Sequence, residues 1–450
     1  MTQFQNIDKL PPHVNKYLSK YVDNKWKLEL SSNKKYKMAI VIPAIMEYEN
    51  IRKLLQSLSQ NDPAYFDECI IIFVINNLIC SDSKVKDDNR KSLDLIRQLI
   101  SGRKNPDELI TGIINSGMNF GLIDAATDDL QFTEKTGGVG LARKTGMDLA
   151  LNVLDYNNHT GKNILVCLDA DCIVDENYLH EVYQSFHNID NSGSYIKFRH
   201  KIYGDELVHR AMTCYEIYMR YYVLGLKIAE SPYAFHTVGS TLACDVESYI
   251  KIGGMNKKKG GEDFYFMEKL AKVGEIGYIN TTTVYPAGRH SWRVPFGTGP
   301  RVKRFGEQTH DEYKLYSFNS FLLLKKWLKI FHADSNLSAK EYLETAGNVD
   351  QSIKMFLEQN SFIEEWTKIR KNSKTGEQIN KQKVLWFDGL KTLRFIHFLR
   401  NNAFPDENMF DVLDNIFQYI NVEPPVSRNE GSIPHLEDQL KYLEILRSYA

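Results

Sequence analysis

Apolar residues in the first part of the chain form short unbroken runs separated by stretches with helical periodicity. Runs of strand length lie at 38–42, 69–75 and 164–168, and the first is followed at 51–58 by isoleucine and leucine on one helix face. Unbroken apolar strands that alternate with amphipathic helices are typical of a mostly parallel sheet covered by helices on both sides. The pattern therefore predicts an α/β fold.

Between these strands the pattern predicts further elements. A helix is expected at about 91–100 and another at 139–154, with a short strand at about 109–114. The segment 115–138 is rich in glycine and aspartate and is expected to be a long loop. Long loops in compact domains are often functional.

Three regions follow from the change of pattern along the chain. Residues 1–36 are polar and lysine-rich and are expected to form a helical lead-in, 37–305 hold the alternation of strands and helices, and 306–450 are helical. A tyrosine-rich helix at 206–229 falls in the middle region. We interpret its aromatic stripe as core, with stacking on sugar rings as the alternative. The prediction is an α/β domain followed by a C-terminal α-helical domain.

Two local signals lie in the helical region. Ser338 and Glu341 have the spacing of a capping box at a helix start. The segment 320–331, SFLLLKKWLKIF, mixes lysine with leucine, tryptophan and phenylalanine. We interpret it as a packed bundle helix whose lysines reach solvent, and peripheral contact with a membrane surface is the alternative.

Composition narrows the classes of function. The chain has 56 basic and 57 acidic residues and a formal net charge of -1, so it lacks the basic excess of a nucleic-acid binder. No apolar run reaches the ~18 residues of a membrane span, and the N-terminal residues lack a signal-peptide core. Six cysteines form no CxxC pair, which argues against zinc. We expect a cytoplasmic protein, with contact at the inner face of the membrane left open.

The strand at 164–168 ends in two aspartates, Asp169 and Asp171, with one small residue between them. Open α/β sheets bind ligands at the carboxyl ends of their strands, and two carboxylates can converge where the chain leaves the pleat. Oxygen ligands suit Mg²⁺ or Mn²⁺, and Mg²⁺ is usually held by one or two carboxylates together with substrate phosphates. A solvated turn, where aspartate is common, is the alternative.

Two glycine-rich stretches open helices. The carboxylates of GGED at 260–263 either complement a helix dipole or supply a general base. The stretch GGVGLAR at 137–143 is similar to a dinucleotide fingerprint, but FTEKT before it is not a strand and the final glycine is missing. We therefore reject a Rossmann site. Arg143 could still face a phosphate.

Taken in order, these motifs resemble family 2 glycosyltransferases with the GT-A fold, over about residues 37–300. The segments that carry the resemblance are a strand followed by PAIME, a strand followed by NN, GVGLARKTGMDLAL, LDADCIV, VGSTLACDVESYIKIGGMN and GGEDFYFMEKLAKVGEIGYI. The resemblance implies a metal-dependent, inverting enzyme of the hexosyltransferase class. It would move a sugar from a nucleotide-diphosphate sugar to an acceptor hydroxyl, for example in polysaccharide or glycolipid assembly.

The resemblance also implies which residues contact the donor. They come from two strand ends, the glycine-rich helix start, the two aspartates and the stretch after 285: Pro43, Ala44, Glu47, Asn76, Arg143, Asp169, Asp171 and Arg293. Asn76 and Asn77 stand where the family usually has an acidic residue, which leaves the nucleotide base open. Arg289, in the same stretch as Arg293, could also clamp a diphosphate.

The metal and the catalytic base are implied in the same way. Mn²⁺ or Mg²⁺ is the expected cofactor, with Asp171 and Asp169 as its expected ligands and His290 as a candidate third ligand. A surface-loop histidine is the alternative for His290. Asp263 matches the catalytic base of inverting members, with Glu262 next to it.

Two other interpretations stay open. A sugar-1-phosphate nucleotidyltransferase shares the layout and the acidic metal site, but it usually has a glycine-rich loop where this chain has PAIMEYEN. A catalytically silent GT-A-like binding or scaffold protein is the other. The partners expected are a nucleotide-sugar donor and a carbohydrate, glycolipid or small-molecule acceptor, without nucleic acid. The oligomeric state is left open.

Overall fold

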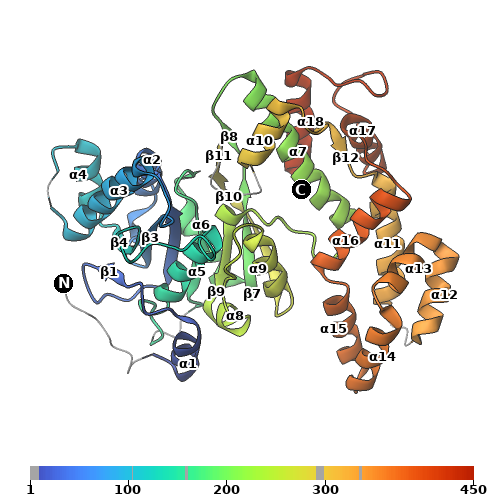
Figure 1. Ribbon diagram of the computed structural model, residues 1–450, viewed down its shortest axis with the longest axis horizontal. Coiled ribbons are helices and arrows are strands. Elements are labelled where there is room, and N and C mark those ends of the chain that lie inside the picture. Colours follow the sequence, from blue (N-terminus) through green and yellow to red (C-terminus); the bar gives the residue numbers. More distant parts are fainter. Residues whose placement is uncertain (1–9, 104, 158–160, 290–297, 334–336) are drawn as a thin grey trace. The chain divides into compact units, whose positions relative to one another are not determined.

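The chain folds into two compact units, each built from two stretches of sequence. The computed structural model describes residues 10–103, 105–157, 161–289, 298–333 and 337–450 (Figure 1). Residues up to Tyr203 together with Thr237–Pro300 form the first, which we call the α/β unit. Residues Gly204–His236 and Arg301–Ala450 form the second, the helical unit.

Within the described residues, the α/β unit is centred on a nine-stranded sheet of order β1-β4-β3-β2-β5-β9-β7-β10-β6. The strands are β1 Leu28–Leu30, β2 Met38–Ala44, β3 Cys69–Asn76, β4 Asn119–Ala125, β5 Ile164–Cys167, β6 Ile173–Val174, β7 Asn191–Phe198, β9 Leu242–Asp245 and β10 Glu275–Tyr285. Strands β4, β3, β2 and β5 run parallel, as do β7 and β10. Strands β1, β6 and β9 are antiparallel to their neighbours. The predicted α/β class with a mainly parallel sheet is confirmed.

Helices cover both faces of this sheet (Figure 1). They are α1 Pro12–Tyr21, α2 Tyr48–Ser59, α3 Ser83–Ser101, α4 Glu108–Asn115, α5 Val139–Ala150, α6 Tyr178–Asn188, α8 Val246–Lys251 and α9 Glu262–Ala271. Ile40 and Ile42 of β2 pack in one cluster with Ile51 of α2. Val41, between them, faces Gly146 of α5 on the other side. Because alternate side chains meet different helices, every residue of β2 is buried and the strand has no polar face.

The segment expected to be a strand at about 109–114 is helix α4. The Asp107 side chain accepts hydrogen bonds from the backbone N–H groups two and three residues on, at 3.0 and 3.4 Å, and so caps the helix. Ile110 and Ile113 are buried together on one helix face. The strand is β4, inside the segment expected to be a loop. The prediction was wrong because a short apolar run fits either structure, and the cap decides.

The lead-in expected at 1–36 belongs to the α/β unit, in which α1 is a helix and β1 an edge strand. The Tyr17 hydroxyl in α1 donates to the buried carboxylate of Asp148 in α5 at 2.8 Å. The same carboxylate accepts from Tyr249 at 2.6 Å and pairs with Lys144 at 2.9 Å. A buried carboxylate held by three partners thus attaches α1 to α5.

The helical unit has its own core. Its elements are α7 Glu206–Ile228, α11 Phe318–His332, α12 Ala339–Val349, α13 Gln351–Gln359, α14 Phe362–Asn372, α15 Gly376–Trp386, α16 Gly389–Asn402, α17 Met409–Tyr419 and α18 Leu436–Tyr449, with the strand pair β12 Lys314–Leu315 and β13 Glu407–Asn408; helix α10 Thr298–Glu307 spans the boundary in sequence. The capping box of Ser338 and Glu341 opens α12 as predicted. None of the described helices combines the length and apolar character needed to cross a membrane.

Helix α7 packs with the C-terminal helices, so the compact units differ from the single boundary expected after residue 305. Tyr221 of α7 lies in one buried cluster with Phe321 and Trp327 of α11. A Cβ on Gly225 would lie 2.6 Å from the Phe321 ring, so the two helices approach closely. These contacts agree with the core interpretation of the tyrosine stripe and with the bundle-helix interpretation of 320–331. The periodicity of apolar residues shows that a helix has an apolar face, but it does not show in which of the two hydrophobic cores that face is buried.

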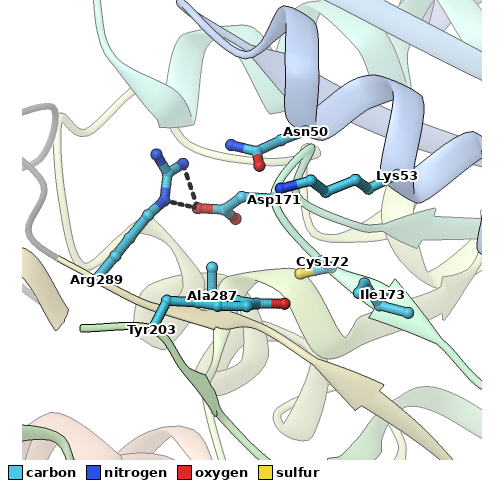
Figure 2. A pocket seen from close by; sticks show the side chains of 8 residues that line it. All are labelled: Asn50, Lys53, Asp171, Cys172, Ile173, Tyr203, Ala287 and Arg289. Carbon is cyan, nitrogen blue, oxygen red and sulfur yellow. Dashed lines mark hydrogen bonds and ion pairs between the residues drawn. The ribbon is translucent and has the colours of Figure 1, made fainter. Parts of the chain in front are cut away.

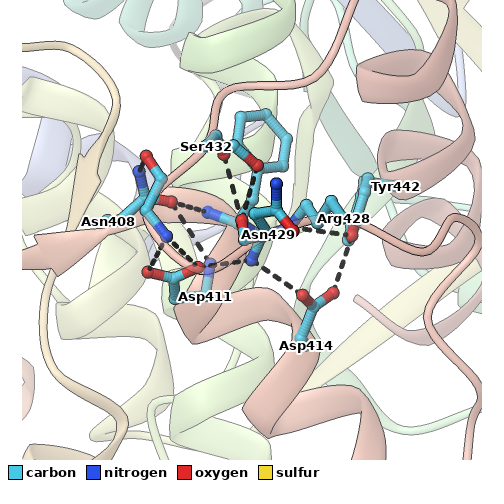
Figure 3. A network of polar contacts seen from close by, with 9 residues as sticks. Asn408, Asp411, Asp414, Arg428, Asn429, Ser432 and Tyr442 are labelled. Carbon is cyan, nitrogen blue, oxygen red and sulfur yellow. Dashed lines mark hydrogen bonds and ion pairs between the residues drawn. The ribbon is translucent and has the colours of Figure 1, made fainter.

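One arginine fixes a loop of the helical unit (Figure 3). Arg428 Nη2 lies 2.7 Å from a carboxylate oxygen of both Asp411 and Asp414 on α17. The Tyr442 hydroxyl of α18 donates to Asp414 at 2.6 Å, and the guanidinium also donates to two carbonyls of its own loop. Charge-assisted hydrogen bonds of this kind order the loop against α17.

We expect Gly146→Ala to destabilise the α/β unit by about 1–3 kcal/mol through overpacking. The added Cβ would lie 2.3 Å from Val41 Cγ1 and 2.8 Å from Val74 Cγ2, because α5 rests directly on the sheet at this glycine. The matched control is Gly112→Ala in α4, where a Cβ meets nothing within 4 Å. That substitution should stabilise by about 0.5–1 kcal/mol through helix propensity. Urea unfolding measures both, and equal effects would contradict the packing argument.

Candidate active site

The two aspartates follow β5 at the carboxyl edge of the parallel strands. After Cys167 the chain turns, with the Cys172 N–H donating to the Asp169 carbonyl at 3.1 Å, and enters β6. The carboxylates of Asp169 and Asp171 pair with different arginines: Arg143 for the first and Arg289 for the second. The sequence prediction of two aspartates at a strand end is confirmed in position, and the structure gives each a separate cationic partner.

Arg143 connects the first aspartate to the GGED motif. Its Nη2 lies 2.6 Å from Asp169 Oδ1, and its Nη1 donates to Glu262 at the start of α9. Arg143 is 3% exposed. Burial disfavours the charged guanidinium, but Asp169 and Glu262 outweigh burial and raise the pKa of Arg143. Two acidic motifs far apart in sequence are thereby brought to one cation.

Glycines allow this arginine to be enclosed. A Cβ on Gly239 would lie 2.6 Å from the Arg143 guanidinium. A Cβ on Gly140, in the first turn of α5, would lie 2.3 Å from the carbonyl oxygen of Lys258 in the loop before α9. A side chain at either position would force the surrounding elements apart. The glycine-rich start of α5 therefore serves close packing around Arg143, which the sequence pattern alone did not distinguish from phosphate binding.

Asp263 lies beside Glu262 in the first turn of α9 and is half-buried. Its Oδ1 accepts the backbone N–H of Phe264 at 2.8 Å. Burial and the neighbouring Glu262 charge raise the pKa of Asp263 to about 7, against a smaller lowering by Arg143. A carboxyl group with this pKa can take up and release a proton near neutral pH.

Arg289 lies between the second aspartate and a glutamate from the loop after β2. Its Nη2 is 2.8 Å from Asp171 Oδ2, and its Nε donates to the same oxygen at 3.2 Å (Figure 2). The Nη2 also lies 2.6 Å from Glu47 Oε1. The other oxygen of Glu47 accepts from the Asn50 amide. Burial raises the pKa of Asp171, and Arg289 opposes that shift. We call this arrangement the Glu47–Arg289–Asp171 bridge.

The bridge borders a cavity of about 260 Å³. Its lining comes from α2, the β5–β6 turn and the small parallel pair β8 Lys201–Ile202 and β11 Ala287–Gly288: Asn50, Lys53, Asp171, Cys172, Ile173, Tyr203, Ala287 and Arg289 (Figure 2). Lys53 and Arg289 place two cationic side chains around one carboxylate. Anionic ligands are held by this kind of surrounding.

The remaining predicted residues fall into two groups. Pro43 and Ala44 are the last residues of β2, and the Asn76 amide donates to the Ala44 carbonyl at 3.1 Å, so these three hold adjacent strand ends together. They do not line the described cavity. His290 and Arg293 lie outside the described residues.

The sequence analysis missed Asn50 and Lys53. Both lie in the first turns of α2, three residues apart on one helix face and directly after Glu47. The three-residue spacing could have indicated that both side chains lie on the same helix face. However, Asn and Lys are common on exposed helix turns, so the spacing alone does not indicate a binding site. Asn89 was also missed; its side chain accepts the Met46 N–H at 2.9 Å and so holds the loop that presents Glu47. Met46 has φ of 54°, an uncommon conformation for a residue other than glycine.

The carboxylate oxygens that line the cavity could bind a divalent cation only if oxygens of the substrate supplied the remaining ligands. Among the described residues, no three His, Cys, Asp or Glu side chains form a group that could hold a metal ion. Asp171 lines the cavity with its side chain 20% exposed. A single carboxylate plus substrate phosphates is a usual arrangement for Mg²⁺. Asp171 therefore fits a metal site shared with a phosphorylated substrate, whereas Asp169 is turned toward Arg143.

No protein-family model matches the sequence, and no curated protein matches it. Solved structures to which the chain is similar include S. aureus TarS 1-349, the mannosyltransferase PcManGT from Pyrobaculum calidifontis in complex with GDP-Man and Mn²⁺, and glucosyl-3-phosphoglycerate synthase from Mycobacterium tuberculosis in complex with Mn²⁺, UDP and glucosyl-3-phosphoglycerate. In that order, the identities are 11%, 13% and 10%, and the TM-scores are 0.34, 0.36 and 0.32. The matches cover 72%, 83% and 72% of this chain and 92%, 92% and 85% of the others. At this level of similarity they carry no argument, so function has to be argued from the site itself.

We expect Arg143→Met to lower the free energy of unfolding by about 3–5 kcal/mol, because it leaves the Asp169 and Glu262 carboxylates without their shared cation. Urea unfolding measures the loss. The matched control is Arg90→Met, which removes an exposed pair with Asp87 whose side chains are 70% and 59% exposed. Exposed pairs contribute about 0–1 kcal/mol, so the control should stay close to the unsubstituted protein. Similar losses of unfolding free energy in the two variants would show that the pairing of Arg143 with Asp169 and Glu262 contributes no more to stability than an exposed ion pair.

Proposed function

We propose that this protein is a metal-dependent glycosyltransferase of the GT-A type, related to family 2. It moves a sugar from a nucleotide-diphosphate sugar to an acceptor hydroxyl with inversion at the anomeric carbon. The observation that carries the proposal is the pairing of Arg143 with both Asp169 and Glu262. It brings the aspartate-bearing strand end and the GGED helix start together, so that a cation-lined cavity and a carboxyl group with pKa of about 7 belong to one unit.

The donor diphosphate would occupy the cavity beside Asp171. Lys53 and Arg289 line it and would pair with phosphate oxygens, and Arg289 can donate through a planar fork. When bound, Mn²⁺ or Mg²⁺ held by Asp171 and the diphosphate would stabilise the departing charge as a Lewis acid. Asn50, which also lines the cavity, donates to Glu47 and so fixes the start of α2. The residues of this chain thus bind and orient the leaving group.

Asp263 would act as the base. The acceptor hydroxyl loses its proton to this carboxylate as its oxygen bonds to the anomeric carbon, and the bond from that carbon to the diphosphate oxygen breaks. A single displacement of this kind inverts the centre. Glu262, which accepts a hydrogen bond from Arg143, lies next to Asp263 and, after burial, is the second cause of its raised pKa. A base with pKa near the working pH is the most effective one.

We expect UDP- or GDP-sugars to raise the melting temperature of the protein, and Mn²⁺ to increase the shift. A ligand that binds only the folded state stabilises it, by about 2.7 kcal/mol at 100 times its Kd. A thermal-shift panel of UDP-, GDP-, dTDP- and CMP-sugars with and without Mn²⁺ tests this. The Mn²⁺-dependent part should disappear in Asp171→Asn and persist in Asp175→Asn, whose carboxylate bonds the Thr283 backbone instead. No shift with any nucleotide would favour the silent-scaffold interpretation.

We expect the second-order rate constant for transfer, kcat/KM, to fall as pH drops below about 7. Below this pKa Asp263 holds a proton and cannot accept another, so activity should decline about tenfold per pH unit. Asp263→Asn should lose about 10²–10⁴ in kcat, the usual contribution of a general base. The pH profile of product formation measures the first effect.

Glu268→Gln provides the matched control. It removes a buried carboxylate of the same helix that pairs with Lys272 at 3.7 Å, so it should keep the pH profile. A flat profile between pH 5 and 8 in the unsubstituted protein, or full activity in Asp263→Asn, would remove Asp263 from the role of base.

A further inference from the structure

In the Glu47–Arg289–Asp171 bridge, the positively charged Arg289 pairs with Asp171, the carboxylate proposed above as the metal ligand. Two nitrogens of Arg289 donate to Asp171 Oδ2, at 2.8 and 3.2 Å. One of them also donates to Glu47 Oε1 at 2.6 Å. The side chains are 31% exposed for Arg289, 20% for Asp171 and 3% for Glu47, so the pairs are largely withdrawn from water. A cation of the protein itself thus balances these two carboxylates.

The backbone on each side of the bridge is fixed by the fold. Ala287 and Gly288 pair with β8, and the Tyr203 N–H donates to the Gly288 carbonyl at 3.1 Å, which sets the point where Arg289 begins. Glu47 opens α2, and its other oxygen is held by Asn50. Asp171 follows β5. The guanidinium therefore reaches both carboxylates from a backbone already in place, through rotation of its own long side chain.

A divalent cation and this guanidinium compete for the same oxygen atoms. A carboxylate that already neutralises an arginine attracts a metal ion less, and two cations within a few ångströms of one another repel. In a partly dehydrated site this repulsion is weakly screened. A metal ion should therefore bind Asp171 more tightly when Arg289 has an anion besides Glu47 to pair with.

A diphosphate is such an anion. Its oxygens match the planar fork of a guanidinium, which binds phosphate at least as well as carboxylate. Lys53 lines the same cavity and would hold the remaining phosphate charge. Pairing of Arg289 with the diphosphate releases Asp171 at the moment when phosphate oxygens become available to complete a metal site.

We infer that Arg289 is a resident cation that divalent metal must replace on Asp171, so that metal and nucleotide diphosphate bind with positive coupling. This inference rests on the proposed function and goes beyond it, since it sets the order and interdependence of ligand binding. Coupling between two ligands is reciprocal: the factor by which nucleotide strengthens metal binding equals the factor by which metal strengthens nucleotide binding. In the absence of nucleotide, the protein should bind the metal ion weakly. A variant without the Arg289 guanidinium should bind the metal ion more tightly even when no nucleotide is present.

The test is a titration of the purified full-length chain with Mn²⁺ alone, in which unbound Mn²⁺ is followed by its electron paramagnetic resonance signal. Arg289→Gln should bind Mn²⁺ at least about tenfold more tightly than the unsubstituted protein, within the usual range of coupling energies. Asp171→Asn should bind more weakly than both, which assigns the ion to Asp171. Equal or weaker binding by Arg289→Gln would overturn the inference.

The second arm adds UDP or GDP. In the unsubstituted protein the nucleotide should strengthen Mn²⁺ binding about tenfold or more, and in Arg289→Gln by a clearly smaller factor. Equal factors in the two proteins would overturn the coupling. If neither nucleotide changes Mn²⁺ binding or the melting temperature of any variant, the proposed function fails, and the comparison with Mn²⁺ alone still decides the role of Arg289.

Two variants control for charge and for folding. Arg97→Gln removes an arginine that bridges two carboxylates elsewhere in the α/β unit, with Nη2 at 2.8 Å from Glu29 and 2.9 Å from Asp124. It should leave Mn²⁺ binding unchanged; tighter binding there would show a general effect of charge removal and overturn the inference. Arg289→Lys keeps the charge without the fork and should fall between the unsubstituted protein and Arg289→Gln. It keeps the test decisive if Arg289→Gln does not fold.

Discussion

The candidate site depends on one buried guanidinium. Arg143 is 3% exposed and neutralises Asp169 and Glu262, which lie 26 and 119 positions away in the sequence. Removing this cation would leave the buried Glu262 carboxylate without its partner. Burial and the neighbouring Glu262, which Arg143 holds in place, raise the pKa of Asp263. The position of α9 at the strand end and the proton affinity of the proposed base are therefore two results of the same ion pair.

The two aspartates of the strand end pair with arginines that differ in exposure. Arg143 is 3% exposed, and a Cβ on Gly239 would lie 2.6 Å from its guanidinium. Arg289 is 31% exposed and borders a cavity. One arginine is thus enclosed by the fold, and the other lies at the border of a cavity. Two aspartates that are two positions apart in the sequence therefore pair with cations in different surroundings.

The sequence could predict features that depend on local pattern. The strands at 38–42, 69–75 and 164–168 were found because burial on both faces leaves an uninterrupted apolar run. Helix α4 was missed because its apolar run is too short for periodicity to decide. The Glu47–Arg289–Asp171 bridge could not be predicted from the sequence, because the two partners of Arg289 lie 118 and 242 positions away and no spacing rule connects them. Contacts across such distances are set by strand order, which one sequence does not reveal.

The two units alternate along the chain, and this has a consequence for how the protein is made. Helix α7 leaves the ribosome before α11 and α18, which pack against it, and before β9 and β10, which complete the sheet of the other unit. Its tyrosines and leucines are therefore exposed in the nascent chain while the α/β unit is still incomplete, a state that favours aggregation or capture by chaperones. No single cut in the polypeptide separates the two units with both intact.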